Sequence, residues 1–153
     1  MTSKANLGGL PIHPMLVGFP IVLFAATIVL ELAHIGTLDA SYYRAAMVAN
    51  IAGVLMALLA AIPGAIDLFS LSTGSAARAT GIRHALLNVL TVALFTISGV
   101  MLFRGWTASA LDAHLPLAFG MIGIVSMTYA MALGHALAAR ALPPRTYGAP
   151  LHH

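Results

Sequence analysis

The sequence predicts an all-α membrane protein whose four transmembrane helices form an up-and-down bundle. Hydrophobic residues make up 60% of the 153 residues and charged residues only 7%, whereas a soluble domain carries about 25% charged residues. Four runs are apolar enough to cross a bilayer core of about 30 Å, which takes roughly 20 helical residues. The polar connections between the runs are short, which makes neighbouring helices antiparallel.

The four runs form a single domain that covers residues 1–153. The uncharged stretch over residues 5–30 is longer than the apolar core of about 7–15 residues in a secretory signal. We therefore interpret the first run as a membrane span. The halves of the sequence show no convincing internal repeat. The spans are expected at about residues 14–35, 44–71, 83–104 and 115–140.

Basic residues predict the orientation, because cytoplasmic loops of membrane proteins carry an excess of Lys and Arg. With the N-terminus inside, only Arg44 and Arg104 fall on the outer side. This bias predicts that both termini are cytoplasmic, in a multi-pass protein of the bacterial inner (cytoplasmic) membrane. The inner side then holds Lys4, Arg78, Arg83, Arg140 and Arg145.

Composition also limits the partners and the chemistry. No basic run suits nucleic acid, so the expected partners are the lipid bilayer and, as hypotheses, a second copy of the chain or a redox partner. The chain has no cysteine. Thiolate metal sites and covalent haem attachment through cysteine are therefore excluded.

One face of each span carries small or polar residues at helical spacing. Such faces pack closely against neighbouring helices in lipid, so we expect them to form the bundle interior, with bulky aliphatic residues facing lipid. The faces are His13, Pro20, Phe24, Thr27, Glu31 and His34 in the first span; Asn50, Gly53, Ala57, Ala60, Gly64 and Asp67 in the second; His84, Asn88, Thr91 and Ser98 in the third; and Gly120, Gly123, Met127 and Gly134 in the fourth.

Each helix brings one titratable residue to the inner side of the bilayer. These residues are His13, Asp67, His84 and His135. Ionisable residues within spans are costly and are by default a functional hypothesis, although snorkelling near a helix end reduces the cost. That structural interpretation is strongest for His135.

Other polar residues surround this inner layer. Asn88 lies one turn deeper than His84, and we expect Arg78 and Arg83 to border the layer from the loop. Either arginine is an alternative, purely structural partner for Asp67. A smaller outer set contains Glu31, His34 and His114, in which Glu31 is expected to pair with Arg44 across the first outer turn.

Three motifs resemble a known bacterial family. The first span opens His13-Pro14-Met15-Leu16-Val17-Gly18-Phe19-Pro20-Ile21, the second ends Gly64-Ala65-Ile66-Asp67, and the third begins His84-Ala85-Leu86-Leu87-Asn88. Together they resemble the membrane-protein family called domain of unknown function 2231, over nearly the whole chain. The resemblance implies four spans and a set of motif residues but no activity. The second histidine of the family's opening motif is Gly18 here.

A b-type haem site for electron transfer or sensing is the first functional hypothesis. Non-covalent haem needs one or two axial ligands and space for the porphyrin. His13, His84 and His135 are the candidate ligands. Arg78 and Arg83 are candidate partners for the propionates, and Gly18, Gly64 and Gly134 are candidates for making room.

Three alternatives remain open, and the sequence does not decide whether the protein is an enzyme. The first is a zinc or iron site made by His13, Asp67 and His84, with His135 as an optional fourth ligand. The second is a proton or solute relay, for which the middle of the spans offers few polar groups. The third is a non-catalytic membrane assembly partner that uses its small-residue faces.

Overall fold

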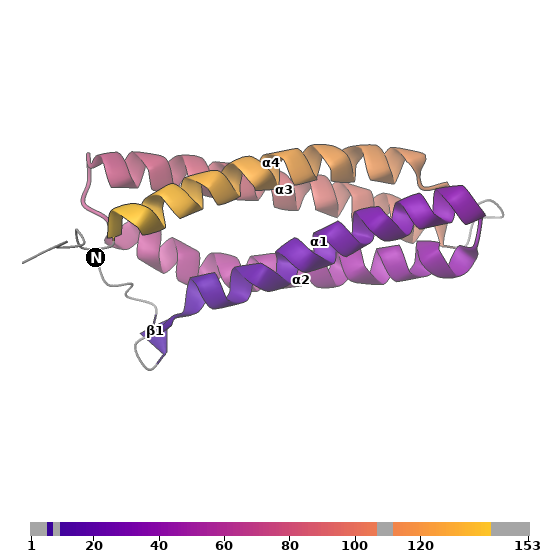
Figure 1. Cartoon of the computed structure of the whole chain (residues 1–153), viewed down its shortest axis with the longest axis horizontal. Coiled ribbons are helices and arrows are strands. Elements are labelled where there is room, and N and C mark those ends of the chain that lie inside the picture. Colours follow the sequence, from indigo (N-terminus) through magenta and orange to yellow (C-terminus); the bar gives the residue numbers. More distant parts are fainter. Residues whose placement is uncertain (1–5, 8–9, 107–111, 142–153) are drawn as a thin grey trace, which may run out of the picture.

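Four long helices form an elongated bundle in the computed structural model, which describes residues 6–7, 10–106 and 112–141 (Figure 1). Each is long and apolar enough to cross a membrane. The predicted four-helix membrane fold is thereby confirmed, while the cytoplasmic location of the termini stays a prediction. The elements are β1 (Asn6–Leu7), which pairs antiparallel with β2 (Leu10–Pro11), α1 (Ile12–Thr37), α2 (Ala40–Ser70), α3 (Ala76–Gly105) and α4 (His114–Ala141).

The helices begin earlier than hydropathy predicts, most clearly α3. Ser75 is its N-cap, and the Ser75 hydroxyl accepts a hydrogen bond from the backbone N–H of Arg78 at 3.1 Å. Such a cap satisfies a backbone donor that the first helical turn leaves unpaired. Arg78 and Arg83 therefore lie within α3, which corrects their expected place in the loop. Hydropathy marks only the apolar part of a helix, whereas α3 extends through the small, alanine-rich segment before it.

The bundle consists of two helical hairpins. Helix α1 packs mainly against α2, and α3 mainly against α4, with fewer contacts between the hairpins. Figure 1 shows α1 and α3 starting at one end of the bundle, where α2 and α4 finish. We call this the near end and the opposite one the far end.

The helix faces are arranged as their spacing predicts. On α2, the six small and polar residues from Asn50 to Asp67 are all buried or half-buried. By contrast, the aliphatic side chains between them project outwards, with Leu55 56% and Ile62 61% exposed. The exposed surface is thus apolar, which suits lipid and not water.

A stacked pair of phenylalanines forms the centre of the bundle. The rings of Phe24 and Phe95 are 3.9 Å apart and nearly parallel, at 11°. Each ring packs on a glycine of its own hairpin: a Cβ at Gly53 would lie 2.7 Å from Phe24, and one at Gly123 would lie 2.7 Å from Phe95. Only glycine allows this close approach. A second apolar cluster, Tyr43, Met47, Leu102 and Ala113, fills the far end.

The two hairpins carry the same residue types at a few matching positions, although the sequence shows no convincing internal repeat. Phe24 and Phe95 each lie eleven residues after a histidine, His13 and His84 respectively. Both hairpins thus place a histidine, a phenylalanine and a glycine at matching points. The shared positions are few and widely spaced, so the sequence halves do not resemble each other. Helices α1 and α3 run in the same direction along the bundle (Figure 1).

Candidate functional site

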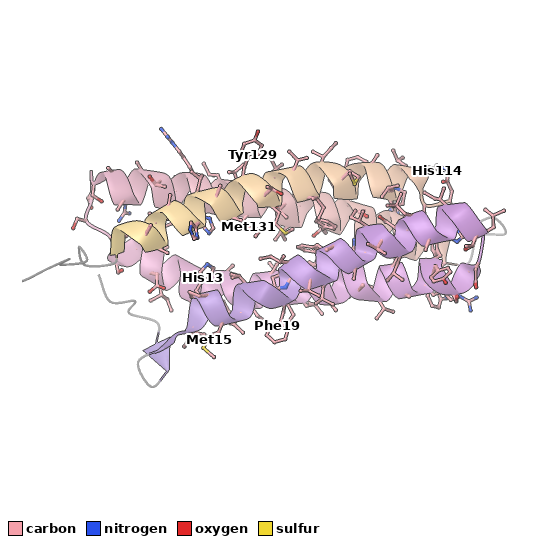
Figure 2. The ribbon with its side chains drawn as sticks, viewed as in Figure 1. His13, Met15, Phe19, His114, Tyr129 and Met131 are labelled. Atoms are coloured by element: carbon pink, nitrogen blue, oxygen red, sulfur yellow. The ribbon has the colours of Figure 1, made fainter. Side chains whose placement is uncertain are left out.

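His13 is fixed in the groove between α1 and α2 at the near end. Its Nδ1 lies 2.8 Å from the backbone carbonyl oxygen of Ala60. One turn later, Gly64 leaves room for the ring, because a Cβ there would lie 2.9 Å from His13. In Figure 2, His13 lies on the bundle side of α1, whereas Met15 and Phe19 project from the other side.

His84 is held in the same way in the second hairpin. Its Nδ1 lies 2.7 Å from the carbonyl oxygen of Ala130, and a Cβ at Gly134 would lie 3.1 Å from its ring. His84 has one further partner. The Asn88 side-chain amide lies 3.0 Å from His84 Nε2 and donates to the His84 carbonyl at 2.9 Å.

These contacts define which ring nitrogen of each neutral histidine carries the hydrogen. A carbonyl oxygen only accepts, so Nδ1 of both His13 and His84 is the donor. The lone pair is then on Nε2, and the Asn88 amide donates to it in His84. Histidines that bind metals are typically fixed in this way, with the other ring nitrogen donating to a carbonyl or carboxylate.

The two imidazoles meet across the interface between the hairpins. Their ring centroids are 6.3 Å apart and their planes are perpendicular, at 89°. With metal–nitrogen bonds of about 2.0–2.1 Å, two imidazoles on opposite sides of one metal ion have centroids roughly 6 Å apart. Both rings are half-buried, and both apolar core clusters lie elsewhere, at the centre and the far end. The pair is therefore the candidate site of the near end.

Residues 9–142 match the family model described as a predicted membrane protein, DUF2231. The chain belongs to the DUF2231 family. The match includes all four helices and both histidines of the pair. No curated protein and no solved structure matches this DUF2231 chain, so its geometry is the basis for any functional proposal.

The other predicted site residues of this DUF2231 protein lie at varied places around the pair. Asp67 follows Gly64 on the same face of α2 and is half-buried. The Arg78 guanidinium donates to the carbonyl of Leu71 at 2.9 Å, and so it ties α3 to the end of α2. Arg83 is exposed. Across the described ranges, no three His, Asp or Glu side chains are grouped so that they could hold a metal ion.

Two candidates lie outside the pair. His135 follows Gly134 directly, but its side chain is exposed, as expected from the next position on a helix. Gly18 is also exposed, and a Cβ there would meet nothing within 4 Å. Of the three glycines considered for making room, only Gly64 and Gly134 therefore adjoin the histidine rings.

The outer polar set differs from the prediction. Glu31 is 0% exposed and accepts a hydrogen bond from Ser98, whereas Arg44 is exposed and lies over the Trp106 ring at 5.3 Å. The expected Glu31–Arg44 ion pair is therefore wrong. Arg44 lies on the outward face of α2, where its long side chain reaches the end of α3 and not the bundle interior.

The sequence indicated most residues of the site but not the contacts that they make. The H-A-x-x-N motif marked Asn88, and the small-residue faces marked Gly64 and Gly134. The carbonyl acceptors at Ala60 and Ala130 had no signal, because every residue carries a backbone carbonyl. The contact between Asn50 and Ser98 was also missed, since both were assigned only to packing faces.

Proposed function

We propose that this membrane protein binds b-type haem between its two hairpins, with His84 and His13 as axial ligands, and uses it for electron transfer or redox sensing. One observation carries the proposal: both imidazoles donate Nδ1–H to a backbone carbonyl and thereby keep Nε2 as the metal-binding nitrogen. Haem would supply a reversible one-electron redox centre.

The size of the ligand set favours haem over a bare metal ion. Haem iron takes one or two ligands from the protein, whereas zinc sites typically use three or four. The pair offers two imidazoles at a fitting distance. A zinc or iron site would need Asp67 as a further ligand, which makes it the second candidate.

Neighbouring residues have supporting roles in this proposal. Gly64 and Gly134 seat the two rings, and Asn88 holds Nε2 of His84 until a ligand replaces it. Arg83, exposed beside His84, is the first choice to pair with a propionate, because the Arg78 guanidinium already donates to Leu71. His135 and Gly18 become peripheral to the site.

The proposed setting is the bacterial cytoplasmic membrane, with the pair near its inner surface. Electrons would be exchanged there with a redox partner or with a second copy of the chain. The basic residues that predict this orientation include Lys4 and Arg145, which lie outside the described residues.

Pigment extraction and metal analysis of the purified protein test the proposal. We expect haem b in the parent and a loss of haem in His84→Ala. His114→Ala is the matched control, because His114 is exposed at the far end (Figure 2). If the parent instead contains zinc or non-haem iron, and Asp67→Asn loses it, the metal-site function would be favoured over haem binding. A protein that binds neither haem nor metal would favour the assembly-partner function.

A further inference from the structure

A second polar site lies in the far half of the bundle, away from the histidine pair. Glu31, Asn50 and Ser98 come from three different helices, and each is no more than 1% exposed. Ser98 Oγ donates to Glu31 Oε1 at 3.5 Å, and Asn50 Nδ2 donates to Ser98 Oγ at 3.4 Å. The two hairpins differ here. Leu102 stands at the position of α3 that matches Glu31 in α1, and Gly120 stands at the position of α4 that matches Asn50 in α2.

Two oxygen atoms of this set lack a partner. Among the described residues, neither Glu31 Oε2 nor Asn50 Oδ1 has a hydrogen bond, and both atoms are buried. Asn50 Oδ1 can only accept a hydrogen bond, and the same holds for Glu31 Oε2 while the carboxylate is ionised. An unpaired buried polar atom costs about 1–3 kcal/mol. Each of the two oxygens therefore lacks a donor while Glu31 is ionised.

Among the described residues, no lysine or arginine is buried beside Glu31. Tyr43 on α2 and Gly120 on α4 adjoin its carboxyl group, and His34, three residues further along α1, is also buried. His34 Nδ1 lies 2.9 Å from the backbone oxygen of Asp39, and the basic residues of this end, Arg44 and Arg104, are exposed. An ionised carboxylate buried without a cation is costly, and such groups become neutral instead.

We propose that Glu31 is a proton-binding site inside the membrane, with the proton on its unpaired oxygen Oε2. A proton there removes the buried charge and turns an unpaired acceptor into a donor.

Packing favours a proton over a metal cation at this site. A Cβ at Gly99 would lie 2.5 Å from Asn50 Oδ1, and one at Gly120 would lie 3.7 Å from Glu31 Oε2. Gly99 thus packs tightly against Asn50 Oδ1, and Gly120 is in van der Waals contact with Glu31 Oε2. A proton needs no added volume, whereas a sodium ion needs space and several oxygen ligands.

Infrared spectroscopy of the intact protein tests this proposal directly. Glu31 is the only glutamate in the chain, so ¹³C-carboxyl glutamate labels this one side chain. At neutral pH and in sodium-free buffer, the label is expected to give the carbonyl band of a protonated acid. Asn50→Ala is expected to shift that band, because Asn50 donates to the Ser98 hydroxyl that is bonded to Glu31. Ser126→Ala, which removes a buried hydroxyl bonded to Leu87, is expected to leave it unchanged.

A carboxylate band at neutral pH would overturn the proposal. If that band shifted when sodium was added, the site would bind a metal cation instead. Glu31→Gln provides a second measurement, since a glutamine side chain resembles the neutral acid in shape and lack of charge. Its midpoint of thermal unfolding is expected to match the parent's, and a large decrease would contradict a neutral acid.

Discussion

His13 and His84 occupy matching positions in the two hairpins, and their rings meet edge to face with centroids 6.3 Å apart. Each ring is oriented by a carbonyl one helix away and seated on a glycine one turn further along that helix. Both histidines of the pair therefore have the same kinds of contacts. Side chains fixed in this way are pre-oriented for a ligand, which reduces the entropy lost on binding.

The glycines under the rings provide a first prediction. Gly64→Ala is expected to displace His13 and weaken cofactor binding, because the added Cβ would lie 2.9 Å from the ring. Overpacking of this kind costs about 1–3 kcal/mol. Gly134→Ala is expected to have a smaller effect, since its contact with His84 is 3.1 Å. Thermal unfolding in detergent and cofactor content measure both effects.

Gly18→Ala is the control for these two variants, because its Cβ would enter open space. Alanine is favoured over glycine within a helix by roughly 0.5–1 kcal/mol, so this variant is expected to be as stable as the parent or slightly more stable. Equal behaviour of Gly18→Ala and Gly64→Ala would show that Gly64 does not seat the His13 ring.

The inner face of α2 provides a second prediction. Ala57 is half-buried and packs against the core cluster around Phe24 and Phe95. Ala57→Leu is therefore expected to destabilise the protein by about 1–3 kcal/mol. Ala61→Leu is the matched control, because Ala61 is exposed on the same helix. If both variants unfold at the parent's temperature, the Ala57 face is not a tight helix–helix contact.

The membrane orientation is a third prediction. Reporter fusions at Thr73 and at the C-terminus are both expected to read cytoplasmic, because basic residues gather on that side. A fusion at Leu38, in the turn between α1 and α2, is expected to read external. The opposite pattern would place the histidine pair near the outer surface of the membrane.

The start of α2 provides a fourth prediction, on pH. The hydrogen bond from the Ser41 N–H lowers the pKa of Asp39 below its usual value of 3.8. A lowered pKa in the folded state means that the charged cap adds stability above the usual pKa. This stability is lost as the pH falls through the folded-state pKa, below 3.8.

Two substitutions check this pH dependence. Asp39→Ala removes the cap, so it is expected to lower the midpoint of thermal unfolding at neutral pH. Asp39→Asn keeps a good N-cap residue and is expected to retain most of the stability while losing the acid-dependent part. If Asp39→Asn loses as much stability at low pH as the parent does, another group must cause this loss.

The sequence predicted the spans and the buried faces because both depend on patterns along one helix. Hydropathy located four helices, and helical spacing placed Gly64, Asn50 and Ser98 in the interior. Contacts between helices were harder to predict, since they depend on rotation and depth. His135 was therefore kept as a candidate ligand beside His84, although its side chain is exposed in the structure. The proton site was missed because Glu31 was matched with a nearby arginine instead of a distant serine.

The visible absorption spectrum of the purified protein tests the central claim most directly, that His13 and His84 hold haem iron. The parent is expected to show a Soret band with the sharp reduced α-band of six-coordinate iron that has two histidine ligands. His13→Ala is expected to give a five-coordinate spectrum, and His84→Ala is expected to lose the haem, while His114→Ala keeps the parent spectrum. A parent without a Soret band after haem is supplied during expression, or an unchanged spectrum in both His13→Ala and His84→Ala, would contradict the account.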